Sequence, residues 1–172
     1  MKIKIASTSI VLLLLLPLVG GMLAASGADE TNAFQEVLGH YEAVRLSLVK
    51  DSMADVAEHA SAIEHRMHKL AKAFNAREAG VSAEKSAECE ELLPEISSAA
   101  ARLAGSEDLE SAREALFELS KPMGRYRKLA GTEGSMVVFC PMAKKAWVQP
   151  HGEISNPYMG QAMPTCGEII AD

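Results

Sequence analysis

Four successive stripes of apolar residues constrain the fold of this chain more than any other feature. Within each stripe the apolar side chains recur every three or four positions, which places them on one face of an α-helix. The clearest stripe runs from Met53 to Phe74 and predicts a helix over residues 52–75. The other stripes predict helices from Phe34 to Leu48, from Cys89 to Leu103 and from Leu109 to Tyr126.

Two prolines and a capping residue affect the predicted shape and ends of the last two helices. Pro94 interrupts the third stripe, so that helix is expected to kink at the proline or to begin closer to it. Ser106 is predicted to cap the fourth helix, and Pro122 is expected to bend its last turn. Four amphipathic segments joined by short polar connections most simply close into an antiparallel four-helix bundle over residues 29–130. The predicted fold class is mainly α.

The chain changes character after the fourth helix. Residues 136–139 read as a short strand, and residues 140–167 contain four prolines and three glycines, too many for a helix. The same stretch contains Trp147, Tyr158 and three methionines, which makes it too apolar for a disordered tail. Residues 131–172 are therefore predicted to form a short, irregular Cys/Met-rich lobe with little β structure, packed on the bundle as part of one domain.

The N-terminus has the layout of a secretory signal peptide. Lys2 and Lys4 precede an apolar run over residues 10–16, and small residues follow as far as Ala28. We expect cleavage near Ala28 and a periplasmic protein, with an uncleaved membrane anchor as the alternative. Removal of residues 1–28 leaves 15 basic and 23 acidic residues, a net charge of −8. So acidic a chain is not expected to bind nucleic acid, and no membrane association is expected after cleavage.

Soft sulfur donors in the lobe predict a metal site. Thiolate and thioether sulfur favour Cu(I) and related soft ions, and a tryptophan ring can cover a soft cation. Trp147 is expected to be the shielding neighbour. The candidate metal ligands are Cys140, Met142, His151, Met159, Met163 and Cys166.

The same two cysteines fit a disulfide equally well. In an oxidising compartment Cys140 and Cys166 can pair, and closing a loop of that size stabilises a fold by about 3 to 4 kcal/mol. No Cys-x-x-Cys or His-x-x-x-His step fixes a coordination geometry. Spacing alone therefore leaves the metal site and the disulfide as open alternatives.

The remaining reactive residues are interpreted as structural. Histidines on the second helix, together with Glu64 and Met67, could form a second metal site, but they are expected to be solvated or to border the core. These histidines are His59, His65 and His68. Cys89 lies on an apolar stripe and is expected to be buried and unpaired. No nucleophile elbow and no close carboxylate pair indicates catalysis, so the chain is not expected to be an enzyme.

The motifs of the lobe resemble those of the DUF3347 family, bacterial extracytoplasmic domains that also occur attached to CusB-type heavy-metal efflux adaptors. The resemblance covers most of the mature chain, including the segment from Tyr41 to Asp51 and the step from Phe117 to Ser120. It departs from common members at Met159 and Pro164. The matched motifs are C-P-M-A at 140–143, W-x-Q at 147–149, I-x-N-P-Y-x-G at 154–160 and M-x-x-C-G at 163–167.

This resemblance implies an extracytoplasmic helical domain associated with copper or heavy-metal handling. It implies that Cys140, Met142, Met163 and Cys166 are metal ligands. We therefore expect a periplasmic protein that binds a soft metal, most simply copper as Cu(I), in metal handling, resistance or efflux. An efflux adaptor or a copper-assembly protein is the expected partner. The alternative is a disulfide-stapled helical module that binds a partner and has no metal role.

Overall fold

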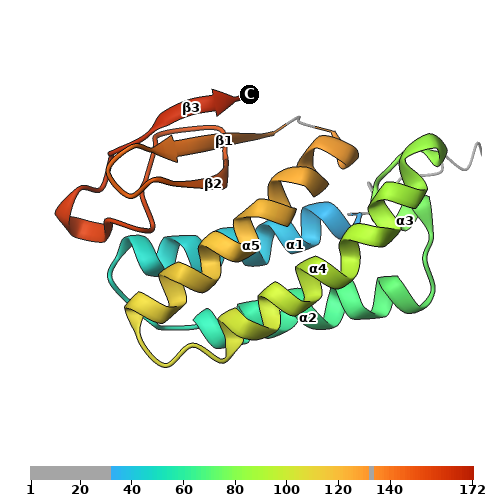
Figure 1. The fold of residues 1–172 in the computed structure, drawn as a ribbon, viewed down its shortest axis with the longest axis horizontal. Coiled ribbons are helices and arrows are strands. Elements are labelled where there is room, and N and C mark those ends of the chain that lie inside the picture. The colour runs from blue at the N-terminus through green and yellow to red at the C-terminus, as the bar shows by residue number, and fades with distance from the viewer. Residues whose placement is uncertain (1–31, 132–133) are drawn as a thin grey trace, which may run out of the picture. The chain divides into compact units, whose positions relative to one another are not determined.

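The structure, a computed structural model, describes residues 32–131 and 134–172 (Figure 1). The predicted signal peptide, residues 1–28, lies outside the described residues. The helices are α1 (Ala33–Val49), α2 (Val56–Lys72), α3 (Ala76–Ala79), α4 (Ser86–Ala104) and α5 (Leu109–Ala130), with 3-10 turns at Ala83–Lys85 and Gly160–Ala162. The strands are β1 (Ser135–Cys140), β2 (Lys145–Pro150) and β3 (Glu168–Ala171). The mainly α class is confirmed.

The apolar stripes lie where the sequence places them, because each stripe forms the buried face of a helix. Helix α2 is shorter than the predicted 52–75 because Asp51 and Asp55 both adopt left-handed backbone conformations, which delay its start. At its other end the chain leaves helical geometry at Ala73 and then forms the separate short helix α3.

Pro94 lies inside its helix, which does not begin at the proline, and the predicted cap at Ser106 is wrong. Helix α4 begins at Ser86, well before Pro94, and continues through the proline. The buried Leu92, Leu93 and Ile96 flank Pro94, so core packing holds the helix together where one backbone hydrogen bond is missing. Helix α5 is capped by Asp108, not by Ser106. The Asp108 carboxylate accepts from the Ser111 backbone N–H at 2.8 Å, which places the cap two residues later than predicted.

The four long helices enclose the main hydrophobic core. Helix α1 contacts α2 and α5, and α4 contacts α2 and α5. None of the helices within the described ranges is long and apolar enough to cross a membrane. The largest fully buried side chains include Phe34, Tyr41, Leu48, Ile63, Met67, Leu70, Leu92, Leu93, Ile96, Leu103 and Tyr126.

The C-terminal lobe is more regular than the sequence predicts, because it contains a three-stranded antiparallel sheet in the order β2-β1-β3. The prediction of an irregular lobe with one short strand was wrong on this point. Its prolines and glycines are spread through the connections and strand ends, where they do not break the ladder. Residues 141–144 form the hairpin turn between β1 and β2, with Lys144 in a left-handed conformation.

Strand β2 packs against α5, which fixes the sheet on the helices (Figure 1). Its Trp147 and Val148 are almost fully buried, and so is Val138, which pairs with Trp147 on β1. Strand β3 is exposed along its whole length. The helices and the sheet belong to one compact unit.

Candidate functional site

The two cysteines of the lobe lie in contact. Cys140 ends β1 and is fully buried, whereas Cys166 precedes β3 and is half-buried. Their Sγ atoms are 2.7 Å apart, and both cysteines are free thiols in this structure. The sheet causes this approach, because β3 pairs with β1 and brings the segment before β3 to the end of β1. The Cys-Pro-Met and Met-x-x-Cys half-motifs therefore meet at one point.

The surroundings of the two thiols shift their pKa values in opposite directions. Burial disfavours the Cys140 thiolate, but hydrogen bonds from Cys166, from the Ala143 backbone N–H and from Asn156 outweigh burial and lower the pKa of Cys140. The pKa of Cys166 is raised, chiefly because its thiol proton is shared with Cys140 and also because of burial. A low-pKa thiolate is the form that binds a soft metal or attacks a disulfide.

Asn156 holds the segment that carries Cys166. This side chain is fully buried, and its oxygen accepts from the backbone N–H groups of Tyr158 (2.8 Å) and Met159 (3.0 Å). Its amide nitrogen donates to the Cys166 carbonyl at 2.6 Å. The Asn-Pro-Tyr turn thus binds directly to the cysteine segment, and one side chain fixes both.

Trp147 and Gln149 lie on the same face of β2, since side chains two apart on a strand point the same way. The Trp147 indole N–H donates to the Gln149 side-chain oxygen at 2.8 Å, and Gln149 donates to the Glu153 carbonyl at 3.0 Å. A Cβ at Gly167 would lie 2.9 Å from the edge of the Trp147 ring and 2.7 Å from Val138. The tryptophan therefore packs beside the residue that follows Cys166.

Two arginines fasten the loop before Cys166 to the helices. Buried Arg45 of α1 donates from Nη1 to the Ser155 carbonyl (2.5 Å) and hydroxyl (2.7 Å), while its other nitrogens bind Glu42 at 2.6 Å. Arg113 of α5 donates from Nε to the Pro157 carbonyl at 2.8 Å. Both guanidinium groups thus donate to backbone carbonyls of residues 155–157, which holds this segment against α1 and α5.

A chain of hydroxyls joins the sheet to the helix core. The Tyr41 and Ser120 oxygens are 2.6 Å apart, and the Ser120 hydroxyl also lies 3.1 Å from that of Tyr158. Tyr158 donates to the Ala146 carbonyl of β2 at 2.8 Å, and the Val148 N–H lies 3.4 Å from the Tyr41 hydroxyl. Burial raises the pKa of Tyr41 to about 12 and that of Tyr158 well above its usual value. These groups therefore act as neutral structural links.

The other predicted ligands do not all reach the two cysteines. Met142 lies in the hairpin turn, is 66% exposed, and its backbone N–H bonds to the sulfurs. Met163 is 37% exposed, and its carbonyl accepts from the Cys166 N–H at 3.2 Å. Met159 packs against the core. Lys145 at the start of β2 pairs with Cys140, whereas His151 follows the other end of β2, about 17 Å or more away along the strand. The His151 Nε2 atom lies 2.7 Å from the Asp172 carboxylate.

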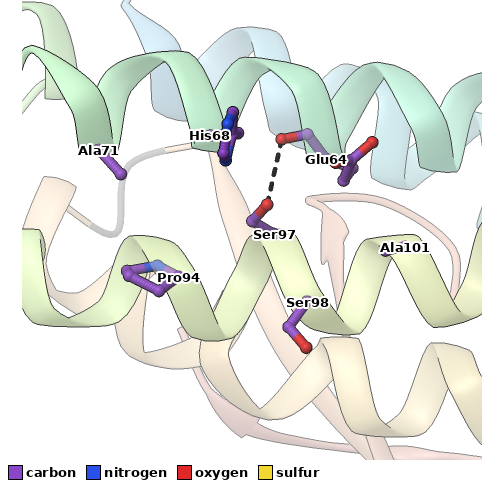
Figure 2. Close-up of a pocket in the computed structure, with 7 residues that line it drawn as sticks. All are labelled: Glu64, His68, Ala71, Pro94, Ser97, Ser98 and Ala101. Atoms are coloured by element: carbon purple, nitrogen blue, oxygen red, sulfur yellow. Dashed lines mark hydrogen bonds between the residues drawn. The ribbon is translucent and has the colours of Figure 1, made fainter.

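The histidines of α2 are dispersed. His65 is 79% exposed, and His68 lines an open pocket of about 270 Å³ between α2 and α4 (Figure 2). His59 faces α1, where its Nδ1 atom lies 3.0 Å from that of His40. Within the described ranges, no group of three or more His, Cys, Asp or Glu side chains could hold a metal ion. The pocket is lined by Glu64, His68 and Ala71 from α2 and by Pro94, Ser97, Ser98 and Ala101 from α4.

Sequence reasoning missed the residues that position the site from the helices. Arg45, Arg113 and Ser120 lie far from Cys140 and Cys166 in the sequence, and none of them was assigned a role at the site. Arg45 and Ser120 are buried and Arg113 is partly buried, and this burial exists only in the folded chain. Cys89 is buried and free as predicted, and burial raises the pKa of its thiol to about 11.

Comparisons with known proteins add no further constraint on the site. No protein-family model, curated protein or solved structure matches the chain. The likeness of the lobe to the DUF3347 motifs thus stays a prediction from the residues quoted above.

Proposed function

We propose that the reduced Cys140 and Cys166 pair binds a soft metal ion, Cu(I), in the periplasm. The observation that carries the proposal is the contact between two thiol sulfurs, 2.7 Å apart, one of them half-buried and reachable from solvent. Thiolate sulfur selects Cu(I) over harder ions, and the lowered pKa of Cys140 favours the thiolate. The role is metal handling, resistance or efflux, without catalysis.

Ion binding requires the two sulfurs to move apart. Two thiolates on one tetrahedral ion, at metal–sulfur distances of about 2.3 Å, keep their sulfurs roughly 3.8 Å apart. Cys140 is fixed at the end of β1, so Cys166, on the exposed side, is the residue that turns outward. The Asn156 bond holds only the Cys166 carbonyl, which leaves its side chain free to rotate.

Exposed thioethers beside the pair extend this proposal. Met142 and Met163 flank the cysteines in sequence and are both exposed, so they can add a ligand or pass the ion to a partner. His151 and Met159 have no part in the proposed site, because one lies at the far end of β2 and the other packs on the core. An efflux adaptor or a copper-assembly protein is the partner that would receive the ion.

We further propose that α1, α2, α4 and α5 form an antiparallel four-helix bundle that carries the lobe.

The test is a chelator competition for Cu(I) with reduced protein in the absence of oxygen. We expect one Cu(I) per chain, and we expect Cys140→Ser and Cys166→Ser each to abolish uptake. Cys89→Ser is the matched control, because this buried thiol lies on α4 and is expected to leave uptake unchanged. Uptake that survives either lobe substitution, or no uptake by the wild type, contradicts the proposal.

A second candidate function rests on the sulfur separation itself. The 2.7 Å distance is closer to a disulfide bond of about 2.05 Å than to the spacing around an ion. We propose as the alternative that oxidation closes the lobe and that the protein is a helical module for partner binding. Thiol counting on protein isolated without reductant separates the two. One free thiol, at Cys89, together with no Cu(I) uptake after reduction, would favour the module.

A further inference from the structure

His40 and His59 face each other across the contact between α1 and α2. Both side chains are half-buried, and their Nδ1 atoms are 3.0 Å apart. The ring centroids are 5.3 Å apart, so the two nitrogens lie close to the line between the ring centres. The two nitrogens are therefore directed at each other.

Their positions on the two apolar stripes explain why they meet. His59 lies between the buried Val56 and Ile63, and His40 lies between the buried Val37 and Val44. Each imidazole therefore borders the core on its own helix and stays partly open to water. Since α1 and α2 pack along these stripes, the two rings are brought together at the edge of the core.

A hydrogen bond between the two Nδ1 atoms requires a donor and an acceptor. In the N–H···N arrangement one ring donates and the other accepts, so the second nitrogen must be unprotonated. Neutral imidazole is the commonest protein ligand for transition metals. To ligate an ion through both Nδ1 atoms, the donor ring gives its Nδ1 proton to water and takes one up at Nε2, so both rings stay neutral and both Nδ1 atoms are free to bind. With metal–nitrogen distances of about 2.0 to 2.1 Å, two imidazoles on one ion lie roughly 3.3 Å apart in tetrahedral geometry and about 4 Å apart in linear geometry. Half-exposed rings can open by this amount through side-chain rotation.

We propose that His40 and His59 form a second metal site, which binds a borderline transition-metal ion such as Cu(II) or Zn(II). Imidazole nitrogen suits these ions, and the Irving–Williams order places Cu(II) above Zn(II). The two histidines supply two ligands, and water fills the remaining positions. This site lies between α1 and α2 and uses no residue of the cysteine pair. The proposal therefore does not depend on Cu(I) binding by the lobe.

The test uses the full chain without a polyhistidine tag, in a Cys140→Ser/Cys166→Ser background. Because this background lacks both lobe thiols, any metal binding that remains cannot come from the cysteine pair, and the two proposals are tested independently. Zinc chloride is titrated by calorimetry, and Cu(II) is followed by its visible absorption. We expect one ion per chain, with Cu(II) bound more tightly. His40→Gln and His59→Gln should each weaken binding about tenfold or more, and the double variant should weaken it little further, because each removes the same site.

Two exposed histidines of the same helix provide the matched control. His65→Gln and His68→Gln should leave the affinity unchanged, because these rings point elsewhere. A second measurement on the unsubstituted histidines covers the case in which a variant fails to fold: Zn(II) should protect His40 and His59 from carbethoxylation, and leave His65 reactive. Equal affinity in His40→Gln, or equal reactivity with and without zinc, overturns the proposal and leaves the pair as a hydrogen bond alone.

Discussion

The Asn156 side-chain amide donates to the carbonyl of Cys166 at 2.6 Å, which links the turn at residues 156–159 to the cysteine segment. Its oxygen also accepts from two backbone N–H groups of that turn. This buried amide therefore helps to hold Cys166 beside Cys140, in addition to the pairing of β3 with β1.

Asn156→Ala should destabilise the protein by about 2 to 4 kcal/mol, because it removes the side-chain partner of one buried N–H group, one partly buried N–H group and one carbonyl. Urea unfolding of the reduced protein measures the effect. Asn75→Ala is the control, since this exposed residue only caps α3 through the Glu78 N–H, and its loss should cost about 1 kcal/mol or less. Equal effects of the two substitutions would contradict the assigned role of Asn156.

Gly160→Ala should destabilise the fold by about 2 to 4 kcal/mol. Gly160 has a φ of 51°, and a Cβ there would overlap the Asp51 carboxylate and the Arg113 guanidinium. Gly124→Ala, in the interior of α5, is the opposite case, because a Cβ meets nothing within 4 Å. We expect that change to stabilise the protein by about 0.5 to 1 kcal/mol, so thermal unfolding of the two variants should shift in opposite directions.

Alkaline titration should show no tyrosine ionisation at the ordinary pKa of 10.0 while the chain is folded. All three tyrosines have raised pKa values, chiefly through burial, with Tyr41 at about 12. A raised pKa in the folded state gives a contribution to stability that is complete below pH 10 and is lost as the pH rises through the folded-state pKa. Phenolate absorbance should therefore rise above pH 10 together with loss of helical circular dichroism. A rise near pH 10 with the helices intact would be inconsistent with these buried hydroxyls.

Oxidation of the lobe cysteines should stabilise the protein by about 3 to 4 kcal/mol relative to the reduced form, through loop closure. Urea unfolding with and without reductant measures the difference. Cys140→Ser should remove the dependence on reductant, whereas Cys89→Ala should keep it, because Cys89 lies on α4 away from the pair. Dependence on reductant that persists in Cys140→Ser would indicate a different pairing.

The helices could be predicted from the sequence because each apolar stripe carries its own period, and Leu92, Leu93 and Ile96 outweigh even Pro94 inside α4. The sheet was harder to predict. Strand β3 has four exposed residues and no burial pattern, so only its pairing with β1 defines it. The cap at Asp108 was missed because Ser106 and Asp108 are both good capping residues, and only the backbone geometry selects between them.

By itself the sequence determined the helical class and the chemical nature of the sulfur donors in the lobe, since these depend on local periodicity and residue type. The tertiary structure alone decided which donors meet. It brings Cys140 to Cys166 because β3 pairs with β1, and it keeps His151 away because β2 is extended. It also joins His40 to His59, because the packing of α1 on α2 is a long-range relationship that no local pattern contains.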